Sequence, residues 1–565
     1  MVEKIHVIFL WSMLILLSDF TLSFATGYTG AGFHVDSIGP VTTIVDSQKY
    51  YQIRYVSSTR GFNESGNGSR ENPWMSLTYA LSRIDSASAD KKYAILVSEG
   101  TYHHGTVVMK EFVDLFGGFS PDNWKRDIFL YRSTLDGMGL HRVVFGADHA
   151  IIDGFTISGG VSNSHGGGIL CLDTSPTITN NFIVNNLVLE PADFDDQHIY
   201  QEGHHGGGIA CLYNSIPVIR NNLIRGNRTA IGIGGGVVFY GLYRKEGVEE
   251  PEFVDNRLVG GVQAILENNI IVENISGAND IKRSRSSSGG AIACAHEARP
   301  IIRNNIIAHN QALGRSDAGG IYIKYFSYPQ VEYNWILGNV CDDDGGGLYT
   351  MRQSQPLIKG NIFAGNWTHS GGCGALRLSK EGRAEVVENL IVSNPGGGVM
   401  SVDSYIQLEG NTIIDNSAGS AFRYVQNFSY YQPSLIQNNI MRGNEEGPLK
   451  ITTDKGHPLI ILNNNMDSES FLIDNANFDP SFISDGLQDR IKSIEYNDSI
   501  YLSVIEPVKK LSDTELLKGR IIHIGDWWGV IQKTVNGKIW AWGNFKEKIL
   551  MKMDFEISPS YTISE

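Results

Sequence analysis

Four aspartates fall in the turns of two successive sequence repeats, where their carboxylates could hold a cation. Asp342, Asp343 and Asp344 are consecutive and precede three glycines, and Asp317 lies just before the glycines of the preceding repeat. Carboxylate oxygens are the ligands that Ca²⁺ prefers, and adjacent carboxylates repel one another. We therefore predict a weak calcium site shared between Asp317 and at most two of the three consecutive aspartates. The alternative is a solvated turn, in which Asp is common.

A second set of residues, aromatic and basic, suits the chemistry of a sugar that carries a carboxylate. In β-elimination from a uronate, a cation offsets the carboxylate charge while Lys, Arg, Tyr or His accepts the neighbouring proton. Aromatic faces can stack on sugar rings. The hypothesis gives catalytic roles to Lys324, Arg377 and Arg352 and substrate-binding roles to Tyr240, Tyr322 and Tyr349. The alternative is a solvated sheet face on which these side chains merely suit the strand.

The aspartates also allow a different reaction. An inverting glycoside hydrolase needs two carboxyl groups roughly 6.5–9.5 Å apart, and Asp317 with one member of the 342–344 run could supply them. A third possibility is a noncatalytic surface or adhesion protein whose long scaffold is itself the functional object. These three functions remain open at this point, because a fold alone does not choose among them.

The segments that would hold these residues repeat along the chain. Between residues 181 and 444 the pattern N-x-x-x-x-N recurs nine times in the same context, with its first Asn at positions 181, 222, 269, 305, 334, 361, 389, 411 and 439. Most copies follow a run of glycines and a short apolar stretch such as "GGGILC" or "GGGLYT". A unit this short cannot bury its own apolar face, so copies must stack. Its apolar pieces have the length of strands and no helical periodicity, which predicts a β-solenoid.

Alternation within these strands predicts which side chains point inward. Cys171, Cys211 and Cys294 hold one inward position, which indicates a buried stack of thiols and not a disulfide framework. The paired Asn positions predict amide ladders between coils spaced about 4.8 Å apart. The neighbouring positions, including those of the tyrosines and Lys324, then face outward, and we expect Tyr322, Lys324 and Tyr349 to line one exposed face.

These repeats resemble those of the right-handed parallel β-helix superfamily, which includes pectate lyases and other polysaccharide lyases. The resemblance covers roughly residues 130 to 480. "GGAI" at 289–292 and "FAGN" at 363–366 are also similar to the repeats of chlamydial polymorphic outer-membrane proteins. The resemblance implies an all-β fold, a right-handed parallel β-helix, and leaves the activity open.

The two ends of the chain differ from the repeats. Residues 1–25 have an apolar run and a small-x-small pair, which predicts a signal peptide and an exported protein, secreted or at the cell surface. Residues 26–130 contain strand patterns and "WMSLTYALSRI", which is typical of a short amphipathic helix that caps the open end of the solenoid. Repeats are expected over 131–480. Residues 481–565 predict a small β-module with an Asn-Gly hairpin turn and clustered tryptophans.

Composition limits the partners. The chain has 565 residues, and 46 Lys and Arg against 61 Asp and Glu give a net charge of −15. This balance argues against broad binding to nucleic acid, and no segment after the predicted signal peptide is long and apolar enough to span a bilayer. We expect a monomer without a membrane-spanning helix in its mature form. Its expected partner is a polysaccharide, acidic if the β-elimination hypothesis holds.

Overall fold

The computed structural model describes residues 38–190, 204–241, 262–278 and 287–466, apart from 104, 371, 428–432 and 454–458, together with the strands between 253 and 258 and between 481 and 564. The predicted signal peptide, residues 1–25, lies outside the described residues. So do most of two inserts between the early repeats, 189–205 and 240–256, and most of the basic segment 280–288.

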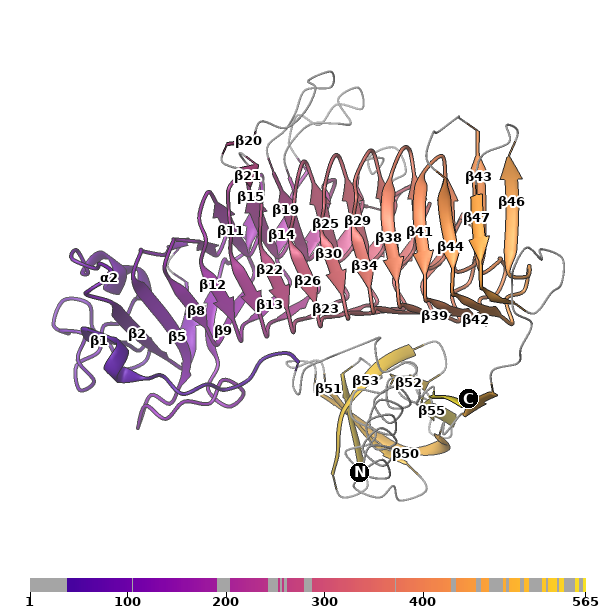
Figure 1. Ribbon diagram of the computed structural model, residues 1–565. Coiled ribbons are helices and arrows are strands. Elements are labelled where there is room, and N and C mark those ends of the chain that lie inside the picture. The colour runs from indigo at the N-terminus through magenta and orange to yellow at the C-terminus, as the bar shows by residue number, and fades with distance from the viewer. Residues whose placement is uncertain are drawn as a thin grey trace, which may run out of the picture. The chain divides into compact units, whose positions relative to one another are not determined.

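Stacked coils build the main body of the protein, and each coil contributes one strand to each of several long parallel sheets (Figure 1). The strands of the 14-stranded sheet are, in order, β1 (Gln52–Val56), β2 (Tyr93–Ser98), β5 (Val113–Phe119), β8 (Ile151–Asp153), β12 (Thr177–Thr179), β16 (Val218–Arg220), β22 (Ile265–Glu267), β26 (Ile301–Arg303), β30 (Gln330–Glu332), β34 (Leu357–Lys359), β38 (Arg383–Val387), β41 (Tyr405–Glu409), β44 (Ser434–Gln437) and β47 (Leu459–Leu462). Those of the 13-stranded sheet are β3 (Gly100–Tyr102), β6 (Ser133–Asp136), β9 (Phe155–Ser158), β13 (Phe182–Val184), β17 (Leu223–Arg225), β23 (Ile270–Val272), β27 (Ile306–Ala308), β31 (Trp335–Leu337), β35 (Ile362–Ala364), β39 (Leu390–Val392), β42 (Thr412–Ile414), β45 (Ile440–Arg442) and β48 (Asn465–Met466).

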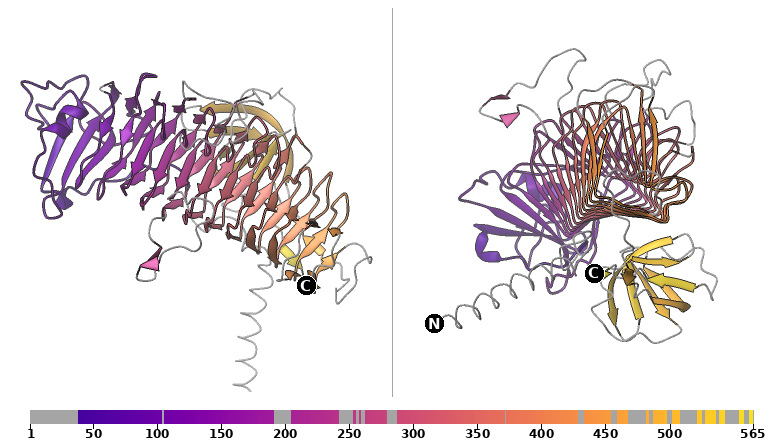
Figure 2. Two further views of the ribbon diagram at one scale, coloured as in Figure 1. Left: turned by 90° about the horizontal axis from the view of Figure 1, so that it is seen from above. Right: turned by 45° about the vertical axis from the view of Figure 1, so that its right-hand side comes forward.

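Two further sheets complete the coils and carry the residues of chemical interest. The 12-stranded sheet contains β4 (Val107–Val108), β7 (Val144–Phe145), β11 (Ile169–Leu172), β15 (Ile209–Leu212), β19 (Val237–Tyr240), β25 (Ile292–Ala295), β29 (Ile321–Lys324), β33 (Leu348–Met351), β37 (Leu376–Ser379), β40 (Val399–Val402), β43 (Phe422–Gln426) and β46 (Leu449–Thr453). The 7-stranded sheet contains β10 (Val161–Ser162), β14 (Leu187–Val188), β18 (Arg228–Thr229), β24 (Ile275–Ser276), β28 (Gln311–Ala312), β32 (Val340–Cys341) and β36 (Trp367–Thr368). The predicted parallel β-helix is thus confirmed, and Figure 2 shows the coils superimposed along its axis.

The interior is one continuous column of apolar side chains. Cys171 pairs in register with Cys211, which leads through Phe239 to Cys294. All five cysteines are buried and free, so the predicted thiol stack is confirmed. Because stacked coils share this column, removing a large side chain anywhere along it leaves a cavity that the neighbouring coils cannot readily fill.

Two asparagine ladders run along the turns on either side of the 13-stranded sheet. At Asn334, the amide Nδ2 donates to Asn361 Oδ1 over 2.9 Å and to the Ile302 carbonyl over 2.8 Å, and its own Oδ1 accepts from Asn305. The same bonds recur from coil to coil, for example from Asn339 to Asn366. The predicted structural role of the repeated Asn positions is confirmed: each amide satisfies backbone groups that the turn would leave buried and unpaired.

The N-terminal part of the main body closes the first coils. Helix α2 (Leu77–Ser82) begins after the N-cap Ser76 and buries Leu77, Ala80 and Leu81, which confirms the short amphipathic helix expected there. Residues 38–46 form a second element, here called the strap, which crosses several coils. The Gly39 N–H donates to the Asn268 carbonyl over 2.9 Å, and the Thr43 hydroxyl donates to Asp153 Oδ2 over 3.1 Å.

The C-terminal residues form a separate compact unit. Its antiparallel strands close a barrel in the order β50 (Leu487–Asn497), β51 (Leu502–Pro507), β54 (Lys538–Trp542), β53 (Trp527–Val535), β52 (Ile521–Ile524) and β55 (Asp554–Ile557). Val535 pairs with Lys538 across the predicted hairpin turn. Two short antiparallel pairs of strands lie outside this barrel: β20 (Phe253–Val254) pairs with β21 (Arg257–Leu258), and β49 (Ser481–Ile483) pairs with β56 (Thr562–Ser564). The expected small β-module is confirmed as a barrel.

Candidate functional site

The outer face of the 12-stranded sheet brings together the aromatic and basic residues singled out in the sequence. The register aligns Ala293, Tyr322, Tyr349 and Arg377 in one outward row. A second row contains Tyr240, Ala295 and Lys324. From the coil of Ala293 and Ala295 to the next coils, small side chains therefore give way to rings and cations at the same register positions.

The tyrosines of this face are not exposed, and the prediction of an exposed patch was wrong for them. Tyr240, Tyr322 and Tyr349 are 7%, 5% and 3% exposed. The rings of Tyr322 and Tyr349 stack at 6.0 Å with an interplanar angle of 8°, and the Tyr322 hydroxyl donates to Met351 Sδ over 3.2 Å. These rings belong to a second apolar cluster, distinct from the solenoid interior and built on alanines of the same face. The large rings are buried because the small neighbouring side chains let them pack against the sheet.

Lys324 lies beside this cluster and is its chemically notable neighbour. The residue is half-buried, and its ammonium lies 5.4 Å from the ring centre of Tyr322 and 4.9 Å from that of Tyr325. The Arg352 guanidinium lies 5.1 Å from the Tyr325 ring. Among the described residues, none forms a hydrogen bond or an ion pair with the Lys324 ammonium. Burial, and then the charge of Arg352, lower the pKa of Lys324 to about 8. A substantial neutral fraction of the amine is thus present near pH 8, which an ordinary lysine does not offer.

A row of neighbouring rings, two pairs stacked and two tilted, leads to Lys324 from the earlier coils. Ring centres are 5.3 Å apart from His165 to His205, 5.0 Å from His205 to Tyr240, and 4.6 Å both from Tyr240 to His296 and from His296 to Tyr325. Burial lowers the pKa of His165 to about 4 and that of His296 to about 3, and it lowers the pKa of His205 well below its usual range. These imidazoles are therefore neutral packing groups at physiological pH. This row of rings was missed in the sequence.

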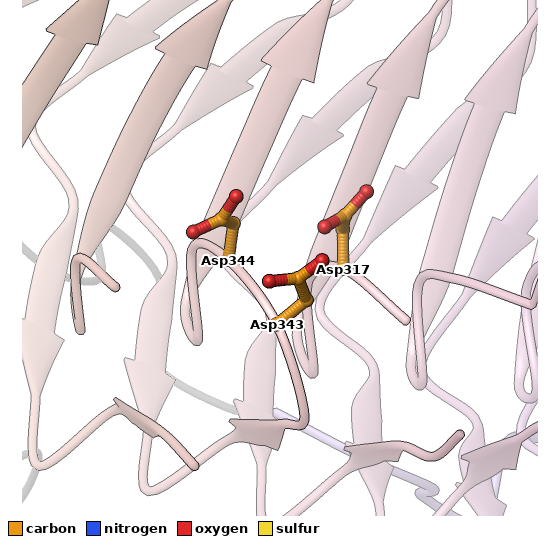
Figure 3. A group of neighbouring side chains, drawn as sticks. All are labelled: Asp317, Asp343 and Asp344. Atoms are coloured by element: carbon orange, nitrogen blue, oxygen red, sulfur yellow. The ribbon is translucent and has the colours of Figure 1, made fainter. Parts of the chain in front are cut away.

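Three of the four predicted metal ligands converge. Asp317 lies between β28 and β29, Asp343 and Asp344 lie between β32 and β33, and their carboxylate oxygens are within 4.8 Å of one another (Figure 3). Burial, then the charges of Asp344 and Asp343, raise the pKa of Asp317 to about 7. Two oxygens on one Ca²⁺ ion are at most about 5 Å apart, since Ca–O distances are about 2.3–2.6 Å. The spacing therefore suits a cation, and a proton is the other way to relieve the repulsion.

The remaining two members of this neighbourhood have partners of their own. Arg377 forms an ion pair with Asp344, and its guanidinium lies 6.0 Å from the Tyr349 ring. This pairing makes Arg377 a positioning group, whereas Lys324 has no ion-pair partner among the described residues. Asp342 turns away from the other aspartates, and its Oδ1 lies 3.1 Å from Nδ1 of His369. Only two of the three consecutive carboxylates thus face Asp317, in agreement with the limit expected for neighbouring turn residues.

The contact between Asp342 and His369 was missed in the sequence, although the repeat contains the signal for it. Each residue stands three positions after the second Asn of its N-x-x-x-x-N pattern, at Asn339 and Asn366. Strands β32 and β36 pair Cys341 with Thr368, so the next residues meet in the adjoining turns. Aligning the turns by the Asn positions, as was done for the strands, would have brought the two together.

Comparisons with known proteins agree with this architecture. Residues 253–404 and 342–466 match the family described as "Right handed beta helix region", and no curated protein matches the chain. Among solved structures, the A-module of the mannuronan C-5 epimerase AlgE4 from Azotobacter vinelandii is 12% identical with a TM-score of 0.36, and the similarity covers 73% of this chain and all of that one, 100%. The GH136 lacto-N-biosidase from Eubacterium ramulus is 12% identical with a TM-score of 0.34, covering 74% of this chain and 68% of that one.

A third solved structure is the tailspike protein gp49 from the Acinetobacter baumannii bacteriophage Fri1, a capsular polysaccharide depolymerase. It is 8% identical with a TM-score of 0.24, covering 83% of this chain and 80% of that one. Similarities this low do not assign an activity. The described residues include no helix of the length and apolar character that a membrane crossing requires.

Proposed function

We propose that this right-handed parallel β-helix protein binds an acidic polysaccharide on the outer face of its 12-stranded sheet and cleaves it by β-elimination. One observation carries the proposal. Lys324 combines a pKa lowered to about 8, two flanking tyrosine rings and the absence of an ion-pair partner among the described residues, beside the cationic Arg352. A lysine in this setting suits a proton acceptor better than a structural salt bridge.

In the proposed reaction, Arg352 binds the uronate carboxylate and offsets its charge, which acidifies the proton on the adjacent carbon. The neutral amine of Lys324 takes that proton. The electrons of the broken C–H bond form a carbon–carbon double bond as the neighbouring C–O bond breaks, and the leaving oxygen takes a proton from water. Tyr325, half-buried between the two cations, replaces the buried tyrosines as the ring beside the substrate.

We also propose that Asp317, Asp343 and Asp344 bind Ca²⁺ weakly. The supporting observation is that three carboxylates from adjacent coils share one 4.8 Å neighbourhood, with the pKa of Asp317 raised by burial and by the other two charges. A bound cation would lower the negative potential beside Arg377 and so favour the approach of a polyanion. Export, as the N-terminal sequence predicts, would deliver the protein to extracellular glycans, on which we propose it acts as a monomer.

The alternative functions make different demands. An inverting hydrolase needs its carboxyls about 6.5–9.5 Å apart to admit a water molecule, whereas the oxygens of Asp317, Asp343 and Asp344 lie within 4.8 Å. The ion pair of Asp344 with Arg377 further argues against a free catalytic acid. A noncatalytic adhesion protein would bind glycan without releasing product.

The test is incubation with polygalacturonate, alginate and hyaluronan, followed by ultraviolet absorbance and reducing-end assays together. Unsaturated uronate products are expected from at least one polymer, with a rate that rises as the pH increases through about 8, because only the neutral Lys324 accepts a proton. Lys324→Met should lower that rate about 100-fold or more. Lys359→Met is the matched control, since Lys359 is a half-exposed lysine on the 14-stranded sheet. Reducing ends without unsaturation, or binding without products, would contradict β-elimination.

A further inference from the structure

The 7-stranded sheet ends abruptly at β36, and this end forms a ledge on the surface of the solenoid. Nine residues, 367–375, separate the ladder residue Asn366 from β37, but only 395–398 separate Asn394 from β40. The shorter coil contributes no strand to the 7-stranded sheet. The side of β36 that faces this coil is therefore not covered by a further strand of its own sheet.

An aromatic platform lies on this ledge. Trp367 pairs with Val340 of β32, and alternation directs its side chain outward while Thr368 points inward. Trp367 is 37% exposed, although Trp is usually well buried. The ring of His369 lies 4.5 Å from that of Trp367 at an interplanar angle of 57°. The indole supplies an apolar face and the imidazole a polar edge, and the two rings meet at an angle.

Two polar contacts hold His369 in place. Its Nδ1 forms a hydrogen bond with the Cys341 carbonyl over 3.3 Å and lies 3.1 Å from Asp342 Oδ1. The Gly314 N–H donates to the other carboxylate oxygen of Asp342, Oδ2, over 2.5 Å, so the carboxylate is fixed beside the imidazole. In the described part of the chain no group pairs with Nε2 of His369, whose side chain is 52% exposed. This nitrogen remains available to a ligand.

We infer that the Trp367–His369–Asp342 ledge is a binding subsite for a neutral hexose unit of a glycan. The apolar C–H face of a pyranose ring suits the exposed indole, and a ring hydroxyl suits Nε2 of His369, as expected for amphipathic ligands at a Trp platform. A neutral sugar fits better than a uronate, because the adjoining turn carries the negative charges of Asp342, Asp343 and Asp344. The subsite requires neither Lys324 nor a substrate carboxylate, so it goes beyond the proposed lyase activity.

One turn links the ledge to the acidic cluster. Within residues 342–344, Asp342 faces His369 whereas Asp343 and Asp344 face Asp317. The Ser370 hydroxyl, next to His369, also donates to the Asp343 carbonyl over 2.5 Å. The ledge and the acidic cluster therefore share a single turn.

Native affinity electrophoresis tests the inference with soluble neutral polysaccharides: hydroxyethylcellulose, galactomannan, glucomannan, xyloglucan and glycogen. The wild-type protein should be retarded by at least one of them. Trp367→Ala should weaken that binding about tenfold, as loss of an aromatic contact of about 1.4 kcal/mol would. Trp367→Phe, which keeps a ring, should retain most of the affinity, and His369→Ala should lose part of it.

Two control variants establish whether the loss of binding is specific to the ledge. Phe62→Ala removes a 65% exposed ring from the cap and should bind as the wild type does. Lys324→Met should also bind neutral glycan normally, so a failed lyase assay would not affect this result. Unfolding midpoints establish that each variant folds. If Trp367→Ala does not fold, Trp367→Phe and His369→Ala still test the subsite. No retardation of the wild type by any of the five polymers, or equal retardation of the wild type, Trp367→Ala and His369→Ala, overturns the subsite.

Discussion

The asparagine ladders and the outer face of the 12-stranded sheet use the same coil repeat in opposite ways. Along a ladder, every coil supplies the same residue and the same bonds, as from Asn305 to Asn334 and from Asn334 to Asn361. Along the outer face, aligned positions change from Ala293 to Tyr322 and from Ala295 to Lys324. A residue type that recurs at the same position of every coil indicates a structural role that each coil requires. A position whose residue type changes from coil to coil, while the backbone stays the same, indicates where the scaffold can carry a function.

The largest expected effect breaks a ladder. Asn334→Ala removes an amide that satisfies the Ile302 carbonyl and two donors of Asn305, all of them buried. Each buried group left unpaired costs about 1–3 kcal/mol, so the free energy of unfolding should fall by about 3–6 kcal/mol, measured by urea denaturation. Gln311→Ala, which removes an exposed amide nearby, should change it by less than about 0.5 kcal/mol. If both variants lower the free energy of unfolding equally, a ladder position is no more important for stability than a surface position.

The next effect concerns the stacked histidines. The folded protein takes up a proton at His296 only near pH 3, whereas an unfolded chain does so near pH 6.5. The stability that the neutral imidazole contributes to the fold is therefore fully present above pH 6.5 and is lost as the pH falls toward 3. His296→Asn, which tolerates the positive φ of 55°, should flatten that acid dependence by an amount on the order of a few kcal/mol.

The matched control for His296 is His149→Asn. His149 has a positive φ of 53° and stacks on Phe112 at 5.0 Å, but its side chain is exposed. Urea midpoints at pH 7, 5 and 4 should distinguish the two variants. If His149→Asn flattens the profile as much as His296→Asn does, burial of the stacked imidazoles is not the cause.

A smaller effect of opposite sign is expected at Asp317. Its folded pKa of about 7 exceeds that of an unfolded chain, so the carboxylate destabilises the fold increasingly as the pH rises from about 4 through 7. Asp317→Asn should therefore stabilise the chelator-treated protein at pH 8 by about 1–3 kcal/mol and leave it unchanged near pH 4. Asp90→Asn, at an exposed position of the cap, should have no such effect.

Calcium sharpens the prediction at Asp317. At pH 8, added Ca²⁺ should raise the unfolding midpoint of the wild type and not that of Asp317→Asn, since binding to the folded state alone adds stability. A rise of the same size in both proteins would contradict the metal site and leave the pH-dependent prediction standing.

The smallest effect is expected within the tyrosine cluster. Tyr349→Phe keeps the stacked ring and removes a hydroxyl that lies 2.5 Å from Ser379 Oγ, so the free energy of unfolding should fall by about 1 kcal/mol. Tyr51→Phe, at a 63% exposed position, should have no measurable effect. If Tyr349→Phe lowers the free energy of unfolding by several kcal/mol, the outer face is as important for stability as an asparagine ladder.

The sequence predicted what repeats and failed where the structure departs from repetition. The Asn spacing and the glycine runs specified coils, ladders and the outward rows, because each follows from one backbone geometry. The exposure of Tyr322 and Tyr349 could not be predicted, since it depends on how large rings pack across small neighbours on several coils. The pairing of Asp342 with His369 lay within reach of the repeat but required aligning turns, whose lengths differ from coil to coil.

The strap has a consequence for the order in which the molecule forms. Stacked ladder residues are only 22 to 47 positions apart in the chain, so coils can assemble one upon another as they are synthesised. The bond from Gly39 to Asn268 spans 229 positions, 268 minus 39, and it cannot form before the coil that contains Asn268 is in place. The earliest described segment of the chain therefore completes its docking only after the coils up to Asn268 have formed.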